Sequence, residues 1–570
     1  MQKVQNLFDK FLESKKVFWI TLILIFVAAR SAVWFYPFDS DHWIFYYVGK
    51  AIANGQLLYV DVWDHKPPLI FEFNALMHFL FGGNLILHRI FLTALAVLDI
   101  FLFYKLAKLF AKGLTLGKNG TESVVKVSLL LYVFWRSLAQ FASSGNNTEN
   151  IGLIFLLLMF LAFFKFYSSV IPAKAGIQQD NGIDSRLRGN DKKKDWNNNL
   201  KYLFFSGICL SILFYLKPNM SLLSIPILVE IFLLSYKSIK KFVVNYFVFG
   251  VPFVLQTAFW ILYFSSQNAL REFWVASFAF SSAYAKSTWG GNVSPQTIFI
   301  LILLPFIIPV AIFGIRFLKD FKKVKQDSAY RFLFFMFISS VIFGLALGSF
   351  YPYYFLILLP SFILVIAYGL FRHLKYTSVI PATSLAESRR EAGIPDVRSP
   401  KAKKRDSSTF APMAIGESVE MTMGVLILIG GMTISFAISS KQLINSFSGS
   451  VKAELNEYQQ IADYVKANSN PDDKIVAYTY GAVLYRMAER DSGSRFISAS
   501  VLLLDERDQY GFNLSDKFID DIEKSKPKYW IISKDENSLY YQNEKIILYM
   551  LNNFEIEKEF ENYLILKRKH

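Results

Sequence analysis

Eleven runs of mostly apolar residues divide this chain of 570 residues. A run of about 20 such residues can cross a bilayer as a helix. The runs lie near 17–36, 86–110, 126–143, 151–168, 201–216, 219–236, 242–264, 297–315, 332–349, 353–371 and 420–439. The composition agrees, because 53% of the residues are hydrophobic and the mean hydropathy is +0.32. The sequence therefore predicts a polytopic α-helical membrane protein with eleven spans. The closely spaced pair of runs around Lys217-Pro218 could instead form one kinked helix.

The charges between these runs predict how the chain is threaded through the membrane. The net charge is +16, and the basic residues fall in short loops that would share one side. The positive-inside rule makes that side cytoplasmic, and an odd number of spans then places the C-terminal tail outside. This placement of charge excludes nucleic acid as a partner and makes membrane lipids the surroundings of the protein.

Two further features limit the chemistry that the chain can carry out and the way in which it is inserted into the membrane. The single cysteine, Cys209, lies inside an apolar run, which excludes an intrachain disulfide and a cysteine metal site. The first run is long enough to span, and no small-residue cleavage site follows it. We therefore expect a retained first helix rather than a cleaved signal peptide.

The first external loop, residues 36–85, concentrates acids beside the membrane. It carries Asp39, Asp41, Asp61 and Asp64, and Asp64 opens the run Asp64-His65-Lys66-Pro67-Pro68. Within it, Trp43 to Ala53 and Leu69 to Phe81 are aromatic-rich and too short to span. Such segments are typical of amphipathic helices that lie in the membrane interface, and Pro67-Pro68 suits the start of the second one.

Three other clusters fall on the same external side. They are the turn 143–150 with Glu149, the junction at Lys217, and the segment 348–354 with Tyr351, Tyr353 and Tyr354. Ionisable groups at the membrane are functional candidates, so we expect these clusters to meet the first loop and form one site.

The remaining segments suggest the domain organisation. Residues 1–439 would form the transmembrane domain. Two cytoplasmic insertions interrupt it at 169–194 and 378–404; both begin SVIPA, and their composition predicts disorder. Residues 440–570 are charged, with a helical pattern at 452–467 and strand patterns at 474–478, 529–533 and 563–566. They predict a small external α/β domain.

An external site restricts the chemistry. ATP and nucleotide sugars are cytoplasmic, whereas a sugar on a polyprenyl phosphate can be presented on the outer face. Its transfer needs a base for the acceptor hydroxyl and a cation for the departing phosphate. Asp41 is the first choice for the base and Asp39 the second. The structural alternative for either acid is to cap the helix that begins near Trp43.

Lys66 is the candidate for the phosphate contact, although it could instead snorkel or pair with Asp64. His65 could be an acid, a base or a metal ligand, or only a hydrogen-bonding loop residue. The other candidates could instead serve as interface anchors or as an aromatic belt. They are Arg89, Glu149 and Lys217 at span ends, and Tyr351, Tyr353 and Tyr354, which could stack on a sugar.

The loop pattern Gly55-x-x-x-Tyr59-x-Asp61-x-Trp63-Asp64-His65-Lys66-Pro67-Pro68-Leu69 resembles the bacterial membrane glycosyltransferases of the GT-C superfold. The closest type is the protein O-mannosyltransferase and ArnT-like (aminoarabinose transferase-like) superfamily. The resemblance covers nearly the whole chain. It includes the Asn147-Thr148-Glu149 turn, Arg89, Lys217 and the Tyr351-Pro352-x-Tyr354 segment.

The resemblance implies inverting transfer of a hexose or pentose from a polyprenyl-phosphate donor to a lipid- or glycan-borne hydroxyl. Asp41 matches the family's base and Lys66 its phosphate-binding lysine, while Asp61 and Asp64 match the loop pattern. Such an enzyme would modify lipopolysaccharide or polysaccharide of the cell envelope, from the periplasmic side of the bacterial inner membrane.

Two departures from the family pattern matter. The residue after the acid is often Glu and here is His42, which puts dependence on a divalent metal in doubt. Members often have His where this chain has Tyr353. Two rival functions remain. One is a flippase of lipid-linked sugars, which would need polar residues through the membrane depth. The other is a non-catalytic subunit of envelope-glycan assembly.

Overall fold

The computed structural model describes most of the chain. The described residues are 11–35, 38–114, 117–170, 192–283, 293–346, 351–377, 425–441, 444, 450–478, 482–499, 501–502, 511–535, 541 and 543–569. The predicted insertion at 378–404 and the central part of the one at 169–194 lie outside these residues.

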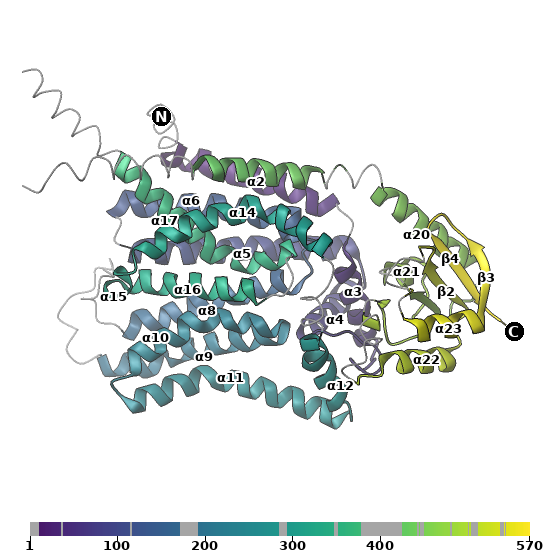
Figure 1. Ribbon diagram of the computed structural model, residues 1–570. Helices are drawn as coiled ribbons and strands as arrows, with labels where there is room; N and C mark the ends of the chain where they lie inside the picture. Colours follow the sequence, from purple (N-terminus) through teal and green to yellow (C-terminus); the bar gives the residue numbers. More distant parts are fainter. Residues whose placement is uncertain are drawn as a thin grey trace, which may run out of the picture.

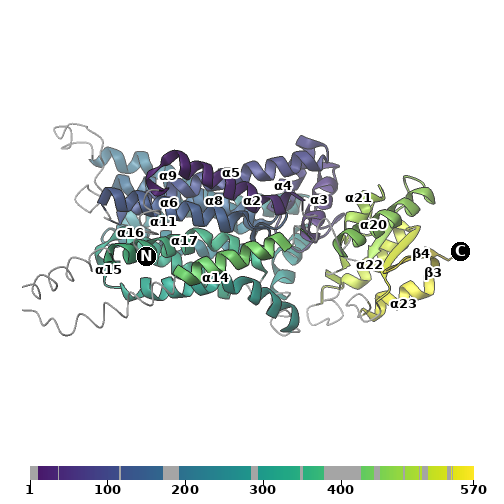
Figure 2. The same cartoon turned by 90° about the horizontal axis from the view of Figure 1, so that it is seen from above.

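A helical bundle occupies one side of the molecule and a small sheet region the other (Figures 1 and 2). Nine helical segments of the described residues are long and apolar enough to span a membrane. They are α2 (Lys15–Phe35), α5 (Leu85–Gly113), α8 (Thr148–Val170), α9 (Lys192–Leu216), η2 with α10 (Pro218–Ser224 and Ile225–Ser235), α11 (Ile239–Ser266), α14 (Val293–Lys319), α16 (Ser328–Leu345), and η4 with α17 (Pro352–Leu358 and Leu359–Thr377). The protein is therefore a multi-pass membrane protein.

Two of the eleven predicted spans differ from the expectation. The span near 126–143 is α6 (Gly117–Ser137), whose first half is polar, followed by the four-residue α7 (Ala139–Ala142). The span near 420–439 corresponds to the shorter apolar helix Val425–Lys441. The pair around Lys217 forms two separate spanning segments, because Lys217 is extended (φ −162°, ψ 111°) and Pro218 starts a new helical turn.

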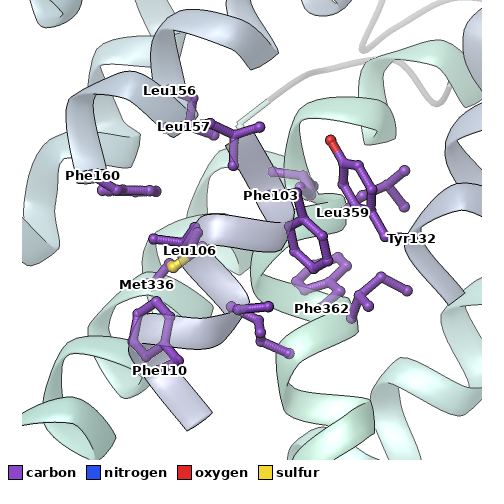
Figure 3. Packing of buried hydrophobic residues seen from close by; sticks show 14 of the residues in the cluster. Phe103, Leu106, Phe110, Tyr132, Leu156, Leu157, Phe160, Met336, Leu359 and Phe362 are labelled. Atoms are coloured by element: carbon purple, nitrogen blue, oxygen red, sulfur yellow. The ribbon is translucent and has the colours of Figure 1, made fainter. Parts of the chain in front are cut away.

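Aromatic and aliphatic side chains fill the centre of the bundle. Phe103 on α5 stacks on Tyr132 of α6, with ring centroids 3.9 Å apart. Phe110 lies about two turns further along α5 and packs against Phe332 of α16, with ring centroids 5.9 Å apart. Figure 3 shows how side chains from α5, α6, α8, α16 and α17 interdigitate in this core. The core makes the bundle a rigid base for the loops at its end.

The first loop forms two helices at the end of the bundle that faces the sheet region (Figure 1). Helix α3 covers Ser40–Ala53 and α4 covers Leu69–Phe81. Pro68 precedes α4, and Gly82 ends it in the left-handed conformation (φ 55°). The loop thus has the two short helices predicted from the sequence.

Gly49 allows these two helices to pack in direct contact. A Cβ at this position would lie 2.5 Å from the carbonyl carbon of Asn74 and 2.6 Å from its Cβ. We expect Gly49→Ala to push α3 from α4 and to lower the free energy of unfolding by about 1–3 kcal/mol. The measurement is thermal unfolding in detergent. Gly250→Ala on α11 is the matched control, because its Cβ would meet nothing within 4 Å. An unchanged melting temperature for Gly49→Ala would contradict the close packing.

The C-terminal part of the chain forms a small mixed sheet flanked by helices (Figure 1). Its strand order is β1-β2-β4-β3, with β1 parallel to β2 and the other pairs antiparallel. The elements are α20 (Ser450–Ala467), β1 (Ile475–Tyr478), α21 (Ala482–Met487), α22 (Leu514–Ser525), β2 (Tyr529–Ser533), α23 (Glu544–Asn553), β3 (Phe554–Glu559) and β4 (Tyr563–Arg568). The predicted helix and three strands are present, and β3 was not predicted.

The sheet region and the first loop share one hydrophobic core. Trp63 of the loop packs against Phe496, with ring centroids 5.4 Å apart, and its backbone N–H donates to the carbonyl of Arg495 at 2.8 Å. At the edge of this contact Lys50 pairs with Asp491 at 3.2 Å. The C-terminal region therefore braces the loop. The predicted division into domains at residues 439 and 440 remains a prediction.

Candidate functional site

Asp39 is the N-cap of α3 and joins that helix to the turn before α8. Its Oδ1 accepts the backbone N–H of His42 at 2.8 Å. Its Oδ2 accepts the hydroxyl of Ser143 and, at 3.2 Å, the N–H of Ser144. Burial, with a further contribution from the charge of Asp41, raises the pKa of Asp39. Asp39 thus has the capping role that the sequence left open. Its carboxylate accepts three hydrogen bonds, from the His42 N–H, the Ser143 hydroxyl and the Ser144 N–H.

Asp41 lies in the first turn of α3, and 29% of its side chain is exposed. Its Oδ1 is 3.7 Å from Nζ of Lys66. Its Oδ2 accepts the hydroxyl of Tyr353 at 3.3 Å. This carboxylate therefore faces a cation and a hydroxyl donor from distant parts of the chain.

Lys66 lies between two carboxylates in the turn that leads into α4. Its Nζ is 3.8 Å from Oδ1 of the buried Asp64 and 4.8 Å from the centre of the Phe45 ring. The same Asp64 oxygen accepts the N–H of Lys66 at 3.2 Å. Both ion-pair distances from Nζ exceed the roughly 2.7–2.9 Å of a close charge-assisted hydrogen bond. The ammonium is thus held near Asp41 without closing tightly on either acid.

His65 stands beside Asp64, with Nδ1 3.7 Å from the Asp64 carboxylate. Burial lowers the pKa of His65 to about 4, although Asp64 opposes the shift. The imidazole is therefore neutral at neutral pH. A neutral ring can accept or donate a proton at its nitrogens without adding charge to the site.

A second ion pair lies beside the first. Nζ of Lys217 is 2.7 Å from Oε1 of Glu149, which lies in the first turn of α8. The same Nζ lies 3.3 Å from the centre of the Tyr354 ring. Burial lowers the pKa of Lys217, and the charges of Lys66 and Asp41 also act on it. The two ion pairs therefore belong to one electrostatic cluster.

Three tyrosines border this cluster. The ring centroids of Tyr353 and Tyr354 are 4.8 Å apart, and Tyr351 lies 5.7 and 5.4 Å from them. Tyr353 and Tyr354 each contact one charged group, Asp41 and Lys217 respectively. The structure thus brings the first loop, the 143–150 turn, Lys217 and the tyrosine segment together.

Two of the residues predicted to act in the site, Arg89 and Asp61, instead bond to backbone atoms of the protein. Arg89 donates to the carbonyl of Val33 at 2.7 Å and lies 3.9 Å above the Phe38 ring. Asp61 is exposed and accepts the N–H of Leu57 at 2.8 Å. The Arg89 contact holds the backbone just before the loop, and the Asp61 contact closes a turn in its middle.

The described surroundings of His42 contain no cluster of metal-ligating side chains. His42 is buried and stacks on Phe38, with ring centroids 3.6 Å apart. Burial and the nearby positive groups lower the pKa of His42. Across the described ranges, no three His, Cys, Asp or Glu side chains are grouped so as to hold a metal ion.

The structure adds several residues that the sequence did not single out for a role. Phe45 supports the Lys66 ammonium, and Ser143 binds Asp39. Tyr59 and Ser281 donate to the backbone carbonyls of Lys66 and His65, and Ser277 donates to the Tyr59 hydroxyl. Two of these residues had a signal in the sequence, Tyr59 as part of the loop pattern and Ser143 as part of the 143–150 turn.

Comparison with known proteins identifies the fold. No protein-family model and no curated protein sequence matches this chain. Among solved structures, ArnT from Cupriavidus metallidurans in the apo state matches with a TM-score of 0.53 and 12% identity, over 95% of this chain and 97% of that one. The crystal structure of the same protein bound to undecaprenyl phosphate matches with a TM-score of 0.50 and 12% identity, over 96% and 97%.

The archaeal oligosaccharyltransferase AglB from Archaeoglobus fulgidus, in complex with an inhibitory peptide and a dolichol-phosphate, matches with a TM-score of 0.44 and 11% identity, over 94% and 72%. The ArnT matches extend over nearly the full length of both chains, which confirms the fold predicted from the sequence pattern. The chain is therefore a polytopic membrane protein with an ArnT-like fold of the GT-C type.

Proposed function

We propose that this protein transfers a sugar from a polyprenyl phosphate to a hydroxyl group of a lipid or glycan, with inversion at the anomeric carbon. The observation that carries the proposal is the arrangement of Asp41 and Lys66, a carboxylate and an ammonium 3.7 Å apart at the end of a membrane bundle. The ArnT crystal structure with undecaprenyl phosphate supports the donor class by analogy of fold.

In this mechanism Asp41 removes the proton of the acceptor hydroxyl as that oxygen attacks the anomeric carbon. The bond between that carbon and the phosphate oxygen breaks, and its electrons leave with the phosphate. The Tyr353 hydroxyl orients one carboxylate oxygen of Asp41 and leaves the other toward Lys66. The sugar passes through an oxocarbenium-like state, which nearby negative charge stabilises.

Lys66 and Lys217 supply positive charge for the departing phosphate. The Lys66 side chain is 21% exposed and lies between two carboxylates. The oxygens of an incoming phosphate can therefore compete with these carboxylates for the N–H donors of the ammonium. Lys217 is paired with Glu149 at 2.7 Å and adds a second ammonium to the same electrostatic cluster. The tyrosines 351, 353 and 354 offer faces on which a sugar ring could stack.

The cellular setting belongs to the same proposal. The basic loops of the bundle would face the cytoplasm, and the site with the C-terminal region would face the periplasm of a bacterial inner membrane. The transmembrane domain, residues 1–439, would carry the catalytic groups. Residues 440–570 would form the periplasmic domain that braces the loop, as the contact between Trp63 and Arg495 suggests.

The test combines a strain and a purified protein. Deletion of the gene, followed by mass spectrometry of envelope lipids and glycans, should remove one sugar mass from one acceptor. The purified protein in liposomes should then transfer that sugar from a polyprenyl phosphate to the acceptor and release free polyprenyl phosphate. Movement of the intact lipid-linked sugar across the liposome without a new glycosidic bond would favour a flippase. A deletion that changes nothing, together with no transfer in liposomes, would refute the proposal.

A further inference from the structure

Two consecutive backbone carbonyls of the Lys66 turn accept hydrogen bonds from side-chain hydroxyls of distant residues. The Tyr59 hydroxyl donates to the carbonyl of Lys66 at 2.7 Å. The Ser281 hydroxyl donates to the carbonyl of His65, also at 2.7 Å. Because Pro67 and Pro68 lack N–H groups, the turn has few backbone donors of its own to fix its position.

Tyr59 is itself held in one position. Its side chain is fully buried, and the hydroxyl of Ser277 donates to its oxygen at 3.1 Å. Its ring packs among Phe71, Phe264 and Phe273, with centroids 5.5–6.5 Å away. Tyr59 also has a φ of 70°, which is disfavoured for a residue with a Cβ. Conformations of this kind persist where surrounding contacts fix them and are common at functional sites.

The two serines come from one irregular helix far along the chain. Ser277 lies in the π-helical turn η3 (Val275–Phe280), which continues the short helix α12 (Leu270–Trp274), and Ser281 follows directly. Turns of this kind shift the register of a helix and often occur at functional sites. Here the turn presents both hydroxyls toward the first loop.

We propose that Tyr59, Ser277 and Ser281 are positioning residues that hold the backbone of His65 and Lys66, so that the Lys66 ammonium stays beside Asp41 where the donor phosphate binds. This inference rests on the function proposed above. The lysine side chain is long and flexible, so its reach depends on where its backbone is fixed. The Tyr59 and Ser281 hydroxyls bond to the backbone of the loop, and Ser277 supports Tyr59, so all three would act through Lys66.

The test is a double-mutant cycle on the binding of undecaprenyl phosphate to the full-length protein in nanodiscs. Tyr59→Phe and Ser281→Ala each remove one hydroxyl and keep the ring or the helix. Each should weaken binding by about five- to tenfold, as expected for one lost hydrogen bond at a fixed site. Ser281→Thr keeps a hydroxyl and should restore binding. Ser266→Ala, which removes an exposed hydroxyl bound to the Tyr263 carbonyl, is the matched control and should bind as the wild type does.

The cycle is completed by Lys66→Gln. If Tyr59 and Ser281 act through the ammonium, adding Tyr59→Phe or Ser281→Ala to Lys66→Gln should change binding by less than about twofold. Full additivity would overturn the positioning role, and so would single variants that bind like the wild type. Should Tyr59→Phe fail to fold, Ser281→Ala and Ser281→Thr give the same comparison. A wild-type protein that neither binds undecaprenyl phosphate nor transfers sugar would instead refute the function proposed above, and this inference with it.

Discussion

Asp41→Asn should reduce sugar transfer by about 10³-fold, because the loss of a general base removes the group that takes the acceptor proton. Asparagine has the size of aspartate and still offers an oxygen to the Tyr353 hydroxyl, so the helix and the tyrosine segment should keep their places. The measurement is the initial rate of transfer by purified protein in liposomes, with kcat and KM determined separately. We expect the loss to fall mainly on kcat, because the proton is removed only as the bond forms.

Asp61→Asn is the matched control for that variant. It makes the same substitution in the same loop, at an exposed residue whose oxygen accepts the Leu57 N–H. An asparagine oxygen can accept the same bond, so the rate should stay within about twofold of the wild type. Wild-type turnover by Asp41→Asn would show that another group acts as the base.

Lys66→Met should lower kcat/KM for the polyprenyl-phosphate donor by about 10²–10³-fold, because it removes the positive charge that the departing phosphate needs. Methionine keeps most of the apolar stem, which lies against the Phe45 ring. The loss should appear both as weaker binding of undecaprenyl phosphate and as slower transfer. Binding and single-turnover rates measure the two effects separately.

Lys50→Met controls for the loss of a lysine near the same helix. Lys50 pairs with Asp491 at 3.2 Å, and 40% of its side chain is exposed. Surface pairs of this kind contribute little, so donor binding should be unchanged. Equal losses in the two variants would mean that general surface charge, and not Lys66, attracts the donor.

The ends of the loop helices show what a sequence can predict. Helix α4 begins at Leu69 and ends at Phe81 as predicted, because Pro68 and Gly82 mark its two ends. Helix α3 begins three residues before the predicted Trp43, because Asp39 caps it. In both cases short-range chemistry sets the boundary, and a short-range pattern can indicate it.

Other elements depend on contacts that no local pattern carries. The predicted span 126–143 breaks at Leu138, whose extended backbone (ψ 139°) separates α6 from α7. Strand β3 was missed because only Phe554 of its six residues is buried, so it lacks an alternating apolar pattern. Its pairing with β4 supplies the stability that its own sequence does not indicate.

The sequence could predict on which side of the bundle the candidate site lies, but not which of its side chains contact one another. The predicted membrane topology placed the acidic loop, Glu149, Lys217 and Tyr353 on one side of the membrane. The bond from Tyr353 to Asp41 joins residues 312 positions apart, and spacing in the sequence gives no measure of it. The same holds for Ser281, since one serine among many carries no signal until its carbonyl partner is seen.

The bracing of the first loop has a consequence for the biogenesis of the protein. The loop is synthesised before its partners, which follow later in the chain, from Ser143 through Ser281 and Tyr353 to Arg495. At usual rates of synthesis, the interval between Trp63 and Arg495 is roughly half a minute or more. During that interval the nascent chain carries an incomplete acidic loop at the membrane surface. The groups of the proposed site can therefore take their final places only after Arg495 has been made, and a chain truncated before the sheet region would leave the loop without its brace.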